Sequence, residues 1–319
     1  MILEDGRPRF EPNYADPAAD GECVIRLSLG GICATDLELV AGYMDYRGVL
    51  GHEWVGVVET SPDPEWIGQR VVGDINCPCL VCPTCLDGRS NHCPNRTVFG
   101  ILGRDGAFSD RFRLPVHCLH RVPDEVADEA AVFVEPLAAA CRILQQIQVQ
   151  PSDRVLVLGV GRLGQLCARV LALTGAQVFA CSRNPARLGM LPSEITPVNT
   201  QDLAGARFDI VVDCTGSHAG LEQATAAVRP GGTIVLKTTV HGGIAPNPNP
   251  WVVDEITVVG SRCGPFPEAL ACLREGMVDP TALITGRFPI EEGVTALKAA
   301  AEREHVKVLL DPVLESSDA

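Results

Sequence analysis

The sequence predicts an α/β protein with two domains, one rich in β-strands and one built around a doubly wound parallel sheet. Its 319 residues exceed the size at which a single hydrophobic core usually stops growing. Short β-type runs separated by Gly, Pro and Asp dominate residues 22–135, whereas strand and helix patterns alternate between residues 154 and 261. Such alternation is typical of parallel strands joined by crossover helices.

The elements follow from these patterns in chain order. Early β-branched runs bounded by turn formers predict strands at 23–29, 54–59 and 70–75. An amphipathic pattern then predicts a helix over 135–149. In the second half we expect a helix over 162–175 and strands at 154–159, 177–182, 208–216, 232–238 and 257–261.

Two further segments depart from simple alternation. The stretch from 183 to 208 is short and carries Pro192 and Pro197, so we expect its crossover to lack a full helix. The tail predicts a helix over 267–278, a turn and helix over 287–304, and a closing strand at 306–314. This tail is expected to return to the first domain.

Composition excludes several classes of partner. The formal net charge of −14 would repel a phosphate backbone, so we expect no nucleic-acid partner. The first residues mix acids and bases without the apolar segment of a signal peptide, and no apolar stretch reaches membrane-spanning length. We therefore expect a cytoplasmic protein with no membrane association.

Four cysteines predict a closed metal site. Cys79, Cys82, Cys85 and Cys93 follow the spacing CxxCxxCx7C. Two overlapping CxxC turns and a short return loop can bring four thiolates around one tetrahedral Zn²⁺, and a full set of four protein ligands is a structural site. Disulfide bonds are the alternative, which suits a chain of this length less well because it needs no covalent staples.

A glycine-rich turn predicts a nucleotide site. Gly159, Gly161 and Gly164 follow an apolar strand and, with Arg162 and Leu163, open the next helix. In this context the first glycine permits a tight turn, the second lets the backbone approach a pyrophosphate, and the third allows close helix–strand packing. A helix N-terminus also favours the negative charge of the phosphates.

The end of the following strand bears on the choice of cofactor. An NAD-binding protein usually carries an acidic residue there, but this chain has Ser182, Arg183 and, slightly further on, Arg187. The two guanidinium groups could clamp a 2′-phosphate through charge-assisted hydrogen bonds, which predicts a preference for NADP(H) over NAD(H). Alternatively, the arginines lie on a solvated helix start.

A second metal site is indicated by a thiol, an imidazole and carboxylates in separate segments, a donor set that suits Zn²⁺ and leaves a position open. The candidate ligands are Cys33 in GICATD, His52 and Glu53 in GHE, and Glu135 in EPLA, and Thr35 and Asp36 of GICATD lie close to Cys33 in sequence.

These motifs together resemble the zinc-containing medium-chain dehydrogenase/reductases, nearest to the polyol and threonine dehydrogenase branch. The similarity covers nearly the whole chain and includes, in order, GICATD, GHEWVGVV, the cysteine loop, GAFSDRFRLP, EPLA, GxGxxG, GGTIVL and VVGS. It implies a GroES-like catalytic domain over 1–135 and 262–319, a Rossmann domain over 136–261, and an active site in the cleft between them.

The resemblance also implies roles for the site residues. Cys33 and His52 would bind the catalytic zinc, and Glu53 and Glu135 would complete or alternate in its coordination. Asp36 would hydrogen-bond the far nitrogen of His52 and set its tautomer. Glu135 could instead serve as the N-terminal cap of the helix that follows it.

The implied activity is hydride transfer between a secondary alcohol or polyol and NAD(P). Thr35 would contact the substrate oxygen and pass its proton towards solvent. Some relatives carry a histidine after this segment as an outer proton relay, whereas this chain has Glu38.

Two other functions are compatible with these motifs, and one predicted strand bears on assembly. A zinc-free quinone or enone reductase could use the same scaffold, and so could a non-catalytic nucleotide-binding protein. The last expected strand, 257–261, offers an edge through which subunits could pair, so we expect a homodimer or homotetramer.

Overall fold

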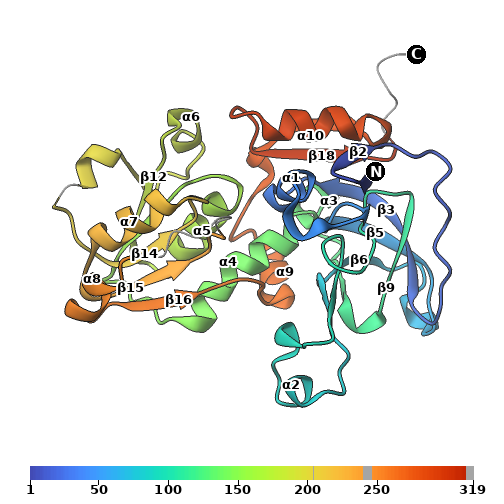
Figure 1. Ribbon diagram of the computed structural model, residues 1–319, viewed down its shortest axis with the longest axis horizontal. Coiled ribbons are helices and arrows are strands. Elements are labelled where there is room, and N and C mark those ends of the chain that lie inside the picture. Colours follow the sequence, from blue (N-terminus) through green and yellow to red (C-terminus); the bar gives the residue numbers. More distant parts are fainter. Residues whose placement is uncertain (204, 240–245, 314–319) are drawn as a thin grey trace. The chain divides into compact units, whose positions relative to one another are not determined.

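The computed structural model describes residues 1–203, 205–239 and 246–313, and the chain divides into two compact units (Figure 1). The first unit comprises Met1–Glu135 and the C-terminal segment from Phe266, and the second comprises Pro136–Pro265. The part of the C-terminal segment that belongs to the first unit thus begins four residues after 262, the boundary given above.

A seven-stranded sheet forms the centre of the first unit. Its order is β10-β6-β5-β3-β18-β17, and β9 also pairs with β3. Two small sheets, β2-β1-β4 and β7-β8, accompany it. The strands are β1 (Ile2–Glu4), β2 (Arg7–Arg9), β3 (Cys23–Gly31), β4 (Gly48–Val49), β5 (Glu53–Thr60), β6 (Arg70–Gly73), β7 (Asn76–Cys77), β8 (Thr97–Val98), β9 (Arg111–Leu114), β10 (Leu119–Arg121), β17 (Ile284–Pro289) and β18 (Lys307–Asp311).

Short helices connect these strands. They are α1 (Ala34–Val40), α2 (Pro83–Leu86), α3 (Asp128–Ala131), α9 (Phe266–Arg274) and α10 (Gly293–Ala301). Six 3₁₀ turns of three residues each also occur among the described residues of this unit: Tyr43–Asp45, Pro64–Trp66, Ser90–His92, Val116–Cys118, Thr281–Leu283 and Ile290–Glu292. One face of α10 packs into a core with Phe108, Leu50 and Leu310.

One expectation about the tail was wrong. We expected a turn at the start of 287–304, but Ile284–Pro289 forms strand β17, which pairs in parallel with β18. The strand lies at the edge of the sheet and most of its residues are only partly buried, so it lacks a continuous apolar pattern. The helix expected over 287–304 is present as α10.

The second unit contains a six-stranded sheet of order β13-β12-β11-β14-β15-β16, parallel throughout (Figure 1). This is the doubly wound order. Strands β12 and β13 are added on one side of β11, and the next three strands are added on its other side. Residues 155–158 of the central strand β11 are fully buried, which explains their continuous apolar character. The strands are β11 (Arg154–Leu158), β12 (Gln177–Cys181), β13 (Thr196–Val198), β14 (Phe208–Asp213), β15 (Val228–Leu236) and β16 (Thr257–Gly260).

The helices of this part are α4 (Val134–Gln146), which spans the boundary at residue 135, α5 (Arg162–Ala172), α6 (Pro185–Leu188), α7 (His218–Ala227) and α8 (Asn249–Val253), with a 3₁₀ turn at Thr200–Leu203. The only helix in the crossover between β12 and β13 is α6, which has four residues, so the full helix is missing as Pro192 and Pro197 predicted. Asn184 caps this short helix through its side chain, which accepts from the amide of Ala186 at 3.1 Å.

Candidate active site and metal centres

Cys33, His52 and Glu53 lie together in the first unit. Each offers a ligand atom within 4.8 Å of the others. The pairing of β3 with β5 places Gly31 opposite Glu53, which brings the residue just before α1 next to the start of β5. His52 and Glu53 are buried, whereas Cys33 is partly exposed.

Asp36 contacts two residues of this group, Cys33 and His52. It is fully buried, and its Oδ2 accepts a hydrogen bond from the amide of Cys33 at 2.8 Å. Its Oδ1 accepts from the amide of Gly51 at 3.3 Å and lies 3.4 Å from Nδ1 of His52. The last contact has the separation of an ion pair without the alignment of a hydrogen bond. The expected pairing of Asp36 with His52 is therefore present as a close contact.

The electrostatics of His52 reflect these neighbours. Burial acts to lower the pKa of His52, but the negative charges of Asp36 and Cys33 outweigh it, so the pKa lies well above its ordinary value. A positive charge is thus stabilised at this position. With Nδ1 facing Asp36, the other ring nitrogen, Nε2, is the one available to a metal ion.

Thr35 and Glu135 are placed differently. The thiol of Cys33 donates to Oγ1 of Thr35 at 3.8 Å, so this hydroxyl lies beside the group. Glu135 is in the first turn of α4 and does not belong to the set of ligand atoms that includes Cys33 and His52. The structure therefore brings together three of the four expected ligands of the catalytic zinc.

The three side chains fit Zn²⁺. A thiolate, an imidazole and a carboxylate are the donors found in zinc sites, and three protein ligands leave the fourth tetrahedral position open. One neighbour of this group was not predicted from the sequence: Lys307, whose ammonium forms an ion pair with Oε2 of Glu53. A single cationic residue within the apolar run 306–310 was the available signal.

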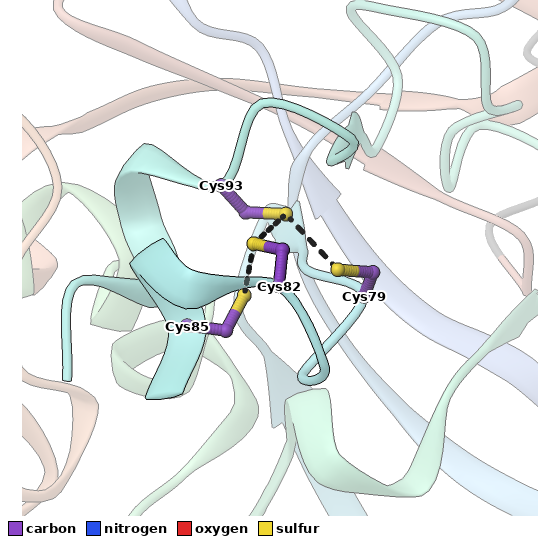
Figure 2. A group of neighbouring side chains, drawn as sticks. All are labelled: Cys79, Cys82, Cys85 and Cys93. Atoms are coloured by element: carbon purple, nitrogen blue, oxygen red, sulfur yellow. Dashed lines mark hydrogen bonds between the residues drawn. The ribbon is translucent and has the colours of Figure 1, made fainter. Parts of the chain in front are cut away.

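The four cysteines between residues 79 and 93 also come together (Figure 2). The Sγ atoms of Cys82 and Cys85 are 3.5 Å apart, those of Cys82 and Cys93 3.7 Å, and those of Cys79 and Cys93 3.5 Å. Amide hydrogen bonds from Val81 and Cys82 lower the pKa of Cys79 to about 6, which favours its thiolate. The thiolate is the form that binds a metal ion.

The alternative of disulfide bonds finds no support. All fourteen cysteines lie within the described ranges and are free thiols. Cys77, close to the loop in sequence, is buried outside the group of four. Four sulfur atoms within 4.8 Å of one another suit a closed tetrahedral Zn²⁺ site.

The glycine-rich turn of the second unit has the expected tight geometry. Gly159 has φ +83°, and a Cβ there would lie 2.8 Å from the carbonyl oxygen of Cys214. A Cβ at Gly164 would lie 2.0 Å from the carbonyl oxygen of Gly159. Gly161 directly precedes α5, whose first turn contains Arg162 and Leu163. The glycines are thus needed for close approach of helix, strand and turn.

Two arginines lie close together at this turn. Burial, together with the positive charge of Arg162, lowers the pKa of Arg187 from its usual value. A Cβ at Gly161 would lie 3.1 Å from Nη1 of Arg187, so this guanidinium reaches the glycine turn. Arg183 is exposed, and Ser182 accepts a hydrogen bond from the amide of Asn184 at 3.1 Å. Arg187 therefore lies close to the glycine turn, a proximity that the sequence alone does not reveal.

Comparison with known proteins agrees with this geometry. Residues 19–124 match the alcohol dehydrogenase GroES-like domain, and residues 163–275 match the zinc-binding dehydrogenase family. The chain therefore belongs to the medium-chain dehydrogenase/reductase superfamily, in the branch of zinc-binding alcohol and polyol dehydrogenases. L-galactonate-5-dehydrogenase of Escherichia coli strain K12 is 29% identical over 293 residues, which cover 85% of each chain.

Solved structures show the same fold. The rspB alcohol dehydrogenase of E. coli CFT073, complexed with NADH, is 26% identical with a TM-score of 0.86, and the match covers 93% of this chain and 94% of that one. A zinc-binding dehydrogenase of Sinorhizobium meliloti 1021, bound to NADP, is 25% identical with a TM-score of 0.83 over the same shares.

Within 1–203, 205–239 and 246–313, the helices are all too short or too polar to cross a bilayer.

Proposed function

We propose that the protein catalyses hydride transfer between a secondary alcohol or polyol, or the corresponding ketone, and a nicotinamide cofactor. The observation that carries this proposal is the convergence of Cys33, His52 and Glu53, with Asp36 behind them. The named substrate of the L-galactonate relative carries several hydroxyl groups, which supports a hydroxyl-rich ligand.

A bound catalytic Zn²⁺ would act as a Lewis acid on the substrate oxygen. Cys33, His52 and Glu53 would hold it, and Asp36 would keep the imidazole of His52 in place through their 3.4 Å contact. Thr35, beside the Cys33 thiol, has the hydroxyl to accept and pass on the substrate's proton. Glu135 is the proposed alternate carboxylate, positioned on α4.

A second zinc is proposed at Cys79, Cys82, Cys85 and Cys93. The four sulfur atoms would fill its coordination, so it would stabilise the loop without reaching substrate. The many reduced thiols fit a cytoplasmic protein.

For the cofactor we propose a preference for NADP(H). Relatives of this fold hold either NADH or NADP, so the choice depends on residues near the end of β12. There the chain offers Ser182, Arg183 and Arg187 and no carboxylate within residues 182–187. The charge of Arg162 next to Arg187 creates a strongly cationic position that an anionic 2′-phosphate would relieve.

For assembly we propose a homodimer or homotetramer. Strand β16 is the edge of the six-stranded sheet and pairs only with β15 among the described strands. Its four residues are partly or fully exposed, so a second subunit could extend the sheet there.

Metal analysis combined with turnover tests the proposal. The purified protein should contain two zinc ions per chain and oxidise members of a polyol panel with NADP⁺. Cys33→Ser should contain one zinc and lose turnover. A wild-type protein with one zinc and reductase activity on quinones or enones would support the zinc-free reductase instead. Absence of any turnover over a broad alcohol and ketone panel would favour a non-catalytic role.

A further inference from the structure

Gln165 and Arg169 are two buried polar residues of α5, with exposed fractions of 0% and 7%. They are four residues apart, so both side chains lie on the same face of the helix. Nη1 of Arg169 donates to Oε1 of Gln165 at 2.6 Å and to the backbone carbonyl of Gln165 at 3.1 Å. Burying a guanidinium and an amide is costly unless their polar atoms find partners, so the partners of this pair show what it holds.

Both side chains reach the crossover that follows β12. Nε2 of Gln165 donates to the carbonyl oxygen of Arg187 at 2.6 Å, and Nη2 of Arg169 donates to that of Met190 at 2.8 Å. Arg187 lies within α6, and Met190 lies two residues after the end of this helix. The two hydrogen bonds therefore fasten the crossover to α5 on either side of the end of α6.

The short helix α6 depends on such outside partners. It has four residues, far fewer than a helix needs to be stable by itself in water. The last carbonyls of a helix also lack a partner in the helical pattern and need another donor. Gln165 supplies a donor to the carbonyl of Arg187, and Arg169 anchors the chain three residues later. The backbone of Arg187 is thus held in place by α5.

The guanidinium of Arg187 needs this support. A Cβ at Gly161 would lie 3.1 Å from Nη1 of Arg187, so the guanidinium lies against the glycine turn. Burial and, second, the positive charge of Arg162 lower the pKa of Arg187 there. Because like charges repel, the guanidinium would move away from Arg162 if the backbone that carries it were released.

We propose that Gln165 and Arg169 are positioning residues for cofactor preference, because they hold Arg187 where its guanidinium faces the glycine turn. The ligand class recognised in this way is a nucleotide with a phosphate on its 2′ oxygen. The inference rests on the proposed preference for NADP(H). Gln165 and Arg169 act through Arg187, whose guanidinium would bind the 2′-phosphate. Loss of either hydrogen bond to the crossover should therefore weaken binding of a 2′-phosphorylated nucleotide and spare other nucleotides.

Titration calorimetry with 2′,5′-ADP and 5′-AMP tests this without turnover, since only the first ligand carries a 2′-phosphate. The wild type should bind 2′,5′-ADP more tightly than 5′-AMP. Gln165→Met keeps a neutral side chain of similar volume but loses the donor to Arg187. It should bind 2′,5′-ADP about fivefold more weakly, the effect of one neutral hydrogen bond, with unchanged affinity for 5′-AMP.

Arg169→Lys is a second variant that keeps the positive charge near the site. A single ammonium does not reproduce the planar fork that bonds Gln165 and Met190 together, so this variant should show the same selective loss. It also tests the inference if Gln165→Met does not fold.

Val170→Ala is the matched control for loss of stability. Val170 is a buried apolar neighbour of Arg169 on α5, and its truncation weakens packing without removing a hydrogen bond to the crossover. This variant should melt at a lower temperature and keep the ratio of the two affinities.

The double variant Gln165→Met with Arg187→Ala tests whether Gln165 acts through Arg187. It should bind 2′,5′-ADP no more weakly than Arg187→Ala alone, because both changes remove the same interaction. Additive losses would overturn the inference. So would equal weakening of both ligands, or unchanged affinity for 2′,5′-ADP, in folded Gln165→Met and Arg169→Lys. A wild-type protein that binds 5′-AMP as tightly as 2′,5′-ADP would instead refute the proposed preference for NADP(H), and the inference with it.

Discussion

The carboxylate of Asp36 lies 3.4 Å from Nδ1 of His52 while its other oxygen accepts a hydrogen bond from the amide of Cys33. One buried side chain thus touches two of the proposed zinc ligands. Its position in α1, three residues after Cys33, makes both contacts possible because the helix starts there. Asp36 therefore couples the first turn of α1 to the start of β5.

Asp36→Asn should weaken binding of the catalytic zinc. The change removes the negative charge behind His52, and loss of such an outer partner usually lowers metal affinity by about 10-fold to 100-fold. Zinc per chain, measured after dialysis against a weak chelator, should fall from two towards one. Turnover should fall in parallel.

Asp74→Asn provides the matched control. Oδ2 of Asp74 lies 3.0 Å from Nε2 of His120. The same change is therefore made in another Asp–His pair, which lies outside the group of Cys33, His52 and Glu53. This variant should keep two zinc ions. Equal zinc loss in both variants would mean that Asp36 has no specific role in metal binding.

Local features of the chain were predictable from sequence. The meeting of the four loop cysteines depends on their spacing within fifteen residues, and the glycine turn depends on a strand–turn–helix pattern. Both act over short distances, so spacing carries most of their geometry. Likewise, two prolines predicted the short crossover after β12.

Non-local features were only partly predictable. The meeting of Cys33 with His52 requires the pairing of β3 with β5, and the motifs suggested it only through resemblance to a family. No periodic pattern links Lys307 with Glu53, since their contact depends on β18 returning beside β3. Strand β17 was missed for a similar reason, because pairing with β18 rather than local apolar content defines it.

Cys93→Ser should remove the structural zinc and leave the catalytic one. Cys93 is fully buried and its sulfur lies within 3.7 Å of those of Cys79 and Cys82, so a hydroxyl there would break the set of four thiolates. We expect one zinc per chain and a lower melting temperature. Elemental analysis and thermal unfolding would measure both.

Cys77→Ser tests whether a cysteine that is only close to the loop in sequence contributes to zinc binding. Cys77 is also buried but lies outside the group of four. It should retain two zinc ions. Zinc loss from Cys77→Ser together with retention in Cys93→Ser would show that the ligand set has been assigned wrongly.

Arg187→Ala should reduce the preference for NADP(H). Its guanidinium reaches the glycine turn beside Arg162, and a hydrogen bond to a charged group contributes about 1.5–3 kcal/mol. KM for NADP⁺ should therefore rise by roughly tenfold or more, with little change for NAD⁺. Steady-state kinetics with both cofactors would measure this.

The exposed Arg183 provides the comparison for Arg187. Because only Arg187 reaches the glycine turn, Arg183→Ala should have the smaller effect on KM for NADP⁺. Parallel increases for NADP⁺ and NAD⁺ in both variants would argue against recognition of a 2′-phosphate.

Gly164→Ala should destabilise the second unit and weaken cofactor binding. Gly164 is the third residue of α5, where helix propensity alone would favour Ala by about 1 kcal/mol. However, its Cβ would lie 2.0 Å from the carbonyl oxygen of Gly159, and overpacking typically costs about 1–3 kcal/mol, more when backbone must move. The clash should outweigh the gain in helix propensity, so the free energy of unfolding measured in urea should fall.

Gly189→Ala, whose Cβ would lie 3.5 Å from the nearest atom, should leave stability and cofactor affinity nearly unchanged. Equal stability of the two variants would mean that α5 can move away from the turn without cost.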